Sequence, residues 1–156
     1  MTALLDDVRT SADWIASALG HSGYQADFSA GSLRGVERFM TEHSDSGVPV
    51  DGGLLATDLG SRLFGLGCYV GETIRLSLGG DWEVDDADPG SELEVRLRLA
   101  DGSVIWPVQR VIKRFRNGPE DSVVAYAVFL GLDVPTHADP HAEPKRRRGL
   151  LRLWRP

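Results

Sequence analysis

The spacing of apolar residues divides the chain into helices, then strands, then helices again. Apolar positions recur at helical spacing over residues 2–19 and over 32–40, so both segments are predicted to be amphipathic helices. Ser32 is expected to cap the second helix. Its apolar face consists of Leu33, Val36, Phe39 and Met40. Residues 44–53 are rich in polar residues and glycine and are predicted to form a loop.

Residues 54–78 form the richest apolar stretch and are predicted to be one long helix ended by Gly79 and Gly80. Each glycine inside a helix costs about 1 kcal/mol relative to alanine. The density of glycine therefore indicates either a bend near residues 65–67 or a close crossing where another element needs access to the backbone. The glycines concerned are Gly60, Gly65, Gly67 and Gly71.

Beyond this helix apolar and polar residues alternate, as is typical of half-buried strands. Strands are expected near residues 81–86, 92–100 and 103–106. Asp101-Gly102 is typical of a two-residue hairpin turn. That turn would pair Val104 with Leu99 and Trp106 with Leu97 on the inner face of the sheet, and Trp82 and Trp106 are both expected in the core.

Two further helices are predicted after the strands. Pro107 is expected to open the first, with an apolar stripe on one side and basic residues facing elsewhere. The stripe consists of Val108, Val111, Ile112 and Phe115, and the basic residues are Arg110, Lys113, Arg114 and Arg116. Pro119 is expected to open the last helix. The core face predicted for that helix consists of Val123, Val124, Ala127, Val128 and Leu130.

These elements predict an α+β fold, in which a small antiparallel β-meander of about three strands packs against four to five helices. No repeated βαβ pattern supports a parallel sheet. Residues 1–133 are predicted to form a single globular domain. Residues 134–156 change in composition and are expected to be a proline-rich linker followed by a disordered basic amphipathic tail.

Charge separates the tail from the rest of the chain. All 23 acidic residues precede Lys145, whereas six of the 17 basic residues lie within 145–155, so the body carries about −12 and the tail +6. The tail interleaves bases with large apolar side chains. Its candidate binding residues are Lys145, Arg146, Arg147, Arg148, Leu150, Leu151, Arg152, Leu153, Trp154 and Arg155.

Such a tail suits an anionic membrane surface or a protein partner. Nucleic acid would also attract the basic residues, but the acidic body argues against a large contact. The remaining interpretation is a disordered end in transient contact with the acids of the body.

Motifs for catalysis and cofactor binding are absent from the sequence. Neither H-E-x-x-H nor G-x-S-x-G occurs, and a partial match to a calcium-binding loop from Asp81 to Glu92 fails at Asp86 and Pro89. No metal ion or cofactor is therefore predicted. Cys68 is the only cysteine, cannot form an internal disulfide and is expected to be a buried packing residue in a reducing, cytoplasmic setting.

Glu72 is the one candidate for acid–base chemistry. It lies within an apolar stretch, where a buried carboxylate would have a raised pKa and could act as a general acid or base. The alternative is an ordinary ion pair with Arg75, three residues further along the helix.

Residues 32–131 resemble an uncharacterised bacterial domain family. The resemblance rests on the segments GCYVGETIR, GGDW and KRFRNGPEDS and on Pro107 after a strand. It implies a bacterial accessory domain, and no functional residue can be carried over from that family, which has no assigned activity.

Two functions remain. The favoured one is a non-catalytic cytosolic accessory or adaptor domain that binds another protein and whose tail docks on an anionic surface or a partner. The alternative is an enzyme with a site around Glu72, Arg110, Lys113 and Arg114.

Overall fold

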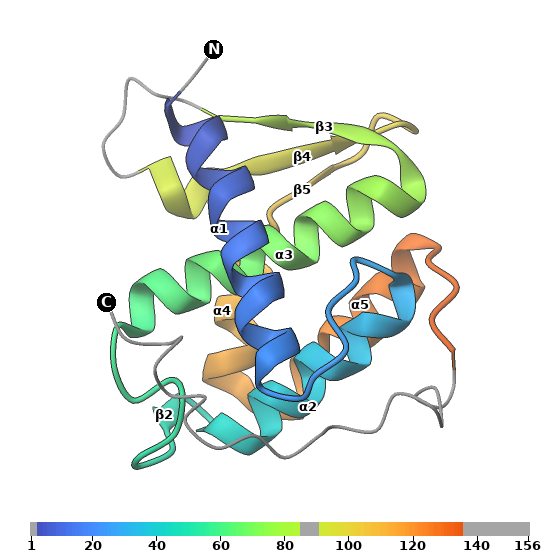
Figure 1. Ribbon diagram of the computed structural model, residues 1–156. Helices are drawn as coiled ribbons and strands as arrows, with labels where there is room; N and C mark the ends of the chain where they lie inside the picture. The colour runs from blue at the N-terminus through green and yellow to red at the C-terminus, as the bar shows by residue number, and fades with distance from the viewer. Residues whose placement is uncertain (1–2, 85–90, 136–156) are drawn as a thin grey trace.

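The computed structural model describes residues 3–84 and 91–135 and shows the expected α+β fold (Figure 1). Its helices are α1 (Ala3–His21), α2 (Leu33–His43), α3 (Leu59–Leu78), α4 (Pro107–Asn117) and α5 (Val123–Leu130). Strands β3 (Gly80–Glu83), β4 (Arg96–Leu99) and β5 (Val104–Ile105) form an antiparallel sheet in that order, and β1 (Ser44–Asp45) pairs with β2 (Val48–Pro49). Short 3-10 turns cover Ala30–Ser32, Ser91–Glu94 and Gly118–Asp121.

Helix α3 lies at the centre of the molecule (Figure 1). Helix α1 crosses it on one side and α4 packs against another, and the three-stranded sheet lies at one end. At the other end α2 packs against α5 and meets α4. The main core lies between these helices and the inner face of the sheet, and a smaller apolar cluster joins the first half of α1 to α3 and α4.

Three of the four glycines of α3 allow a neighbouring element to approach closely. Gly65 faces Ile15 of α1, and Gly67 faces Val108 of α4 so closely that an added Cβ would lie 2.5 Å from the Val108 Cα. Gly71 likewise faces the ring of Trp82. Of the two predicted explanations, the close approach of neighbouring elements is the one that the structure shows.

Helix α3 begins at Leu59, five residues later than predicted. The carbonyl of Leu54 accepts a hydrogen bond of 2.6 Å from the buried guanidinium of Arg62. Asp58 adopts a left-handed conformation with φ of 51° directly before the helix. The preceding apolar residues therefore form turns that Arg62 holds against the helix.

The predicted hairpin register is wrong by one residue. Ala100 joins Asp101 and Gly102 in a three-residue loop, since Leu99 donates its N–H to the carbonyl of Ser103. The shift brings Ile105 opposite Leu97. A one-residue shift moves side chains to the other face of a strand, so Ile105 is buried.

Of three neighbouring expectations, two fail for related local reasons and one holds. Trp106, predicted in the core, is 43% exposed at the start of α4. Trp82 is partly buried against the core, as expected. Leu93 is exposed because residues 91–94 form a 3-10 turn and the strand begins only at Arg96.

The ends of α2 also differ from expectation. Ser32 does not cap the helix with its side chain; its hydroxyl pairs with the hydroxyl of buried Tyr69 at 2.7 Å. Ser29 takes the capping role for the preceding turn by accepting from the N–H of Ser32. After α2, the predicted loop contains the small β1–β2 hairpin.

Arg114 is buried, which corrects its predicted place among the outward-facing bases of α4. Only 2% of its side chain is exposed, and its Nε donates to Glu37 of α2 at 2.9 Å. A second guanidinium nitrogen donates to Thr41 at 3.0 Å. The other carboxylate oxygen of Glu37 accepts the N–H of Val123 at the start of α5. One carboxylate therefore joins α2, α4 and α5.

We expect Gly67→Ala to destabilise the protein and Gly60→Ala to leave it unchanged or stabilise it. The Cβ at position 67 would overlap the backbone of Val108, and overpacking of this kind costs about 1–3 kcal/mol. Nothing lies within 4 Å of a Cβ at position 60, where alanine adds up to about 1 kcal/mol of helix propensity. Chemical denaturation of both variants measures the difference, and equal stabilities would contradict the close crossing.

We expect Arg114→Met to lower the free energy of unfolding by about 3–5 kcal/mol, because it leaves the Glu37 carboxylate without its cationic partner. Adding Glu37→Gln should restore much of the loss, since a neutral amide still accepts from Val123. Lys113→Met, at the adjacent exposed position, serves as the control and should change stability by less than about 0.5 kcal/mol. A loss below about 1 kcal/mol in Arg114→Met would contradict the role assigned to the pair.

Candidate functional site

Glu72 is an ion-paired carboxylate and lacks the raised pKa expected of a buried general acid. Its two oxygens accept from Arg75 at 2.7 and 2.9 Å, and one of them also accepts from the indole N–H of Trp82 at 3.0 Å. The hydrogen bonds from Arg75, helped by that from Trp82, hold the pKa of Glu72 below its ordinary value despite partial burial. The predicted ion pair with Arg75 is confirmed.

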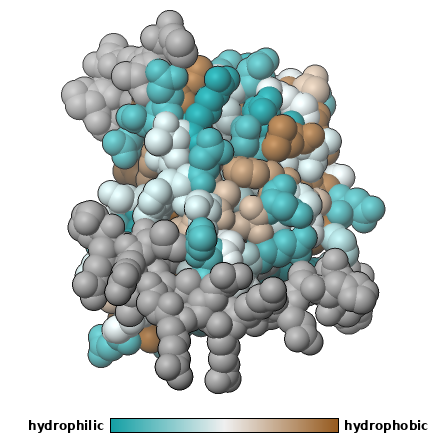
Figure 2. Space-filling view, viewed as in Figure 1, coloured by the Kyte–Doolittle hydropathy of each residue, from teal (hydrophilic) through white to brown (hydrophobic). Residues whose placement is uncertain are grey.

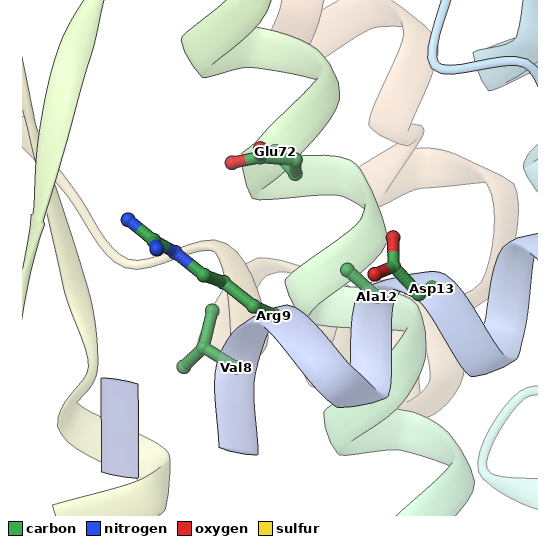
Figure 3. Close-up of a pocket in the computed structure, with 5 residues that line it drawn as sticks. All are labelled: Val8, Arg9, Ala12, Asp13 and Glu72. Carbon is green, nitrogen blue, oxygen red and sulfur yellow. The ribbon is translucent and has the colours of Figure 1, made fainter. Parts of the chain in front are cut away.

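A small hollow lies beside Glu72, between α1 and α3 (Figure 3). Arg9 and Asp13 project from α1 and Glu72 from α3 around the same gap, with Val8 and Ala12 at its base. The hollow holds about 150 Å³, below the roughly 300–1,000 Å³ of usual small-molecule sites. Because both Glu72 oxygens already accept hydrogen bonds, this hollow is poorly suited to proton transfer.

The basic residues proposed as companions of Glu72 have other partners. Arg110 lies 4.0 Å from Asp121 and stacks on the ring of Tyr126 with its Cζ 4.1 Å from the ring centroid. Arg114 pairs with Glu37, and Lys113 is exposed on α4. No described contact joins any of the three to Glu72. The predicted enzyme site is therefore not assembled among the described residues.

A second polar cluster, not predicted from the sequence, surrounds His43 at the end of α2. Its Nδ1 accepts the N–H of Leu54 at 3.0 Å, so the proton of the neutral ring lies on Nε2, 3.2 Å from the hydroxyl of Tyr24. That hydroxyl in turn donates to Glu42 at 2.5 Å. Arg38 lies over the Tyr24 ring and 3.7 Å from Glu42.

Burial lowers the pKa of His43 below its ordinary value, and the charge of Glu42 opposes the shift only partly. Burial also raises the pKa of Tyr24, helped by its bond to Glu42. Both groups thus stay neutral near pH 7 and hold the loop before α3 against α2. The Tyr24 hydroxyl bonds both Glu42 and His43, whereas the buried Nε of Arg38 has no hydrogen-bond partner among the described residues.

Metal and thiol chemistry receive no support from the described residues. Among residues 3–84 and 91–135, no group of three histidine, cysteine, aspartate or glutamate side chains could hold a metal ion. Glu83, part of the rejected calcium-loop match, pairs with Arg96 and Arg98. Cys68 is fully buried, as expected, and burial raises the pKa of its thiol.

The feature that sequence reasoning missed is the outer surface of α5. All eight residues of this helix are apolar or aromatic, but only Val123 and Ala127 are buried. Val128, predicted in the core, is 53% exposed, and Phe129 is 83% exposed. We call the surface formed by Ala125, Val128 and Phe129, with half-buried Val124 beside them, the α5 outer face. The sequence did carry a signal for this surface. Helix α5 is apolar on all sides, and such a helix is normally buried on all sides.

The face of the molecule shown in Figure 2 is mostly polar, in contrast to the α5 outer face. Its coloured residues are mostly hydrophilic, and the brown ones lie in small groups. Within the described ranges, no helix is long and apolar enough to cross a membrane. The tail residues from Lys145 to Arg155 lie outside the described residues.

Comparison with protein families, curated proteins and solved structures finds no match to this chain. The resemblance of residues 32–131 to an uncharacterised bacterial family therefore remains an expectation. The class that the described residues define is an α+β domain in which one helix carries an exposed apolar face.

We expect the free energy of unfolding to fall as the pH drops below about 6.5, because unfolded His43 binds a proton more readily than the folded ring does. Protonation of Nδ1 would also break the bond from Leu54. His43→Asn offers an oxygen in place of Nδ1 and should remove this part of the pH dependence. Denaturation between pH 7.5 and 5, with His21→Asn at an exposed position as the control, measures it; equal slopes in the wild type and His43→Asn would contradict the role of His43.

Proposed function

We propose that this chain is a non-catalytic accessory or adaptor domain that binds another protein through the α5 outer face. The observation that carries the proposal is the exposure of Phe129 and Val128 on a helix without a charged residue. Exposed apolar surface that is contiguous and bounded by polar residues is typical of protein-binding sites. Burial of one phenylalanine side chain contributes roughly 1.5–3 kcal/mol, so this helix offers a natural anchor point.

Charge around α5 indicates the chemistry of the partner. Exposed Glu120 precedes the helix and exposed Asp133 follows it, and the body as a whole is acidic. An apolar segment flanked by basic residues would complement both the apolar face and its acidic ends. The free, buried Cys68 agrees with a reducing cytoplasmic setting for this binding.

The α5 helix is also held firmly enough to serve as a binding surface. Ser122 caps it by accepting from the N–H of Ala125 at 3.1 Å, and Glu37 binds the N–H of Val123. Val123, Ala127 and Leu132 anchor its inner side in the core. A preorganised helix loses little conformational freedom when a partner binds.

The enzyme alternative has weaker support. Glu72 forms an ion pair with Arg75. Arg110 pairs with Asp121, and Arg114 pairs with Glu37. The hollow beside Glu72 is small. A second attachment through the basic tail, to an anionic membrane or a partner, stays a prediction from the sequence.

A photo-crosslinking amino acid in place of Phe129 tests the proposal in cells of the native host. We expect a discrete adduct with another protein, because the probe occupies the centre of the α5 outer face. The same amino acid in place of exposed Lys113 on α4 is the matched control and should give no such adduct.

The adduct partner is then purified and its affinity for the unmodified chain is measured. Phe129→Ser should weaken binding by at least about tenfold, the equivalent of roughly 1.4 kcal/mol, without loss of stability since Phe129 is exposed. Equal adducts from positions 129 and 113, or equal affinity of Phe129→Ser, would contradict the proposed binding surface.

A further inference from the structure

We infer that the α5 outer face is the docking site for residues 145–155 of the same chain. The juxtaposition behind this inference is an uncovered apolar helix face, acids at both ends of that helix, and a basic amphipathic segment attached a short distance beyond it. The contact between α5 and the tail is inferred from these features alone. Its regulatory consequence rests on the proposed function.

The size of the face argues against a second copy of the chain as its occupant. Helix α5 has eight residues and is therefore about 12 Å long. A phenylalanine side chain buries roughly 150–250 Å², whereas a stable interface needs roughly 600 Å² or more from each partner. Phe129 and Val128 thus provide too little area to hold two copies of the chain together unless surfaces beyond α5 also contribute, as they must for the partner in the proposed function.

A tethered segment does not need such an area. When a binding segment belongs to the same molecule, its effective concentration reaches about 1 mM for a short linker of suitable length. A contact with a dissociation constant of about 1 mM between separate molecules would then be half occupied within one molecule. A face of this size is therefore suited to an occupant that the chain itself supplies.

The chain leaves the described structure five residues after α5, beside the start of α2. Leu132 is buried directly after α5, and the carbonyl of Pro135 accepts a hydrogen bond from Arg34 of α2. Residues 136–144 separate that point from Lys145. A linker of this length spans roughly 15–20 Å on average if flexible, enough to return along a 12 Å helix.

The composition of the tail fits the chemistry of the face. Leu150, Leu151, Leu153 and Trp154 supply apolar side chains for Val128 and Phe129. The four bases Lys145, Arg146, Arg147 and Arg148 precede them, and Arg152 and Arg155 are interleaved with them. Bases on either side of the apolar group can approach exposed Glu120 and Asp133 at the two ends of α5.

Docking within the chain would regulate partner binding, given the proposed function. While residues 145–155 cover Phe129, a partner of similar chemistry must displace them, which weakens its apparent affinity. Release of the tail to an anionic surface or to a second partner would uncover the face. The tail would then act as a built-in competitor.

The test uses the purified full-length chain alone in solution. With the photo-crosslinking amino acid at position 129, we expect an intramolecular adduct that mass spectrometry maps to residues 145–155. Replacing Leu150, Leu151 and Trp154 with serine should lower its yield at least about fivefold. Replacing residues 145–148 with glutamine should lower the yield at low salt and have less effect at 500 mM salt, where charges are screened within about 5 Å. The probe at Lys113 is the control.

Four results would overturn the inference: no adduct above the Lys113 control, equal adducts at both positions, an adduct unaffected by the serine substitutions, or an adduct between two molecules that increases with concentration. The last would identify a second copy as the occupant. Each can occur while the probe at 129 still captures another protein in cells, so failure here is distinguishable from failure of the proposed function. Partner affinity that rises at least about threefold in the serine variant would support the competition.

Discussion

The carboxylate of Glu37 is the interaction on which the helical end of the molecule depends. One oxygen holds the buried guanidinium of Arg114, and the other holds the first N–H of α5. Three helices that are distant in sequence meet at this one side chain. A buried cation without its partner is strongly unfavourable, so α4 and α5 have one permitted arrangement relative to α2. The exposed position of Phe129 follows from that arrangement.

The opposite end of the molecule is organised by close packing rather than charge. Glycines along α3 let the backbone approach α1 and α4, and Trp82 covers Gly71 while it binds Glu72. The acid that looked catalytic in the sequence thus fixes a tryptophan between helix and sheet. The same contacts that keep Glu72 ionised leave it little capacity to accept a proton.

The two halves of the molecule differ in how much apolar surface they expose. The packed half, with its small hollow between α1 and α3, supplies a stable support. The half around α5 presents apolar surface at modest cost, because the inner side of that helix is anchored by Val123 and Ala127. A small face favours occupants that are tethered or assisted by charge, and this is why we propose the basic tail as its occupant.

Sequence periodicity by itself determined the order and type of the main elements, since burial of one face imposes a period of about 3.6 on helices and 2 on strands. It predicted the core faces of α2 and α4 and the Glu72–Arg75 pair, which depend on neighbours three or four residues apart. Only the tertiary structure decided the three-residue loop at Ala100 and the burial of Arg114. It also decided the exposure of Val128 and Phe129, because α5 is apolar on every side and its sequence marks no preferred face. Which side of such a helix is buried depends on where α2 and α4 lie, and that is set by contacts such as Glu37 with Arg114, whose partners are far apart along the chain.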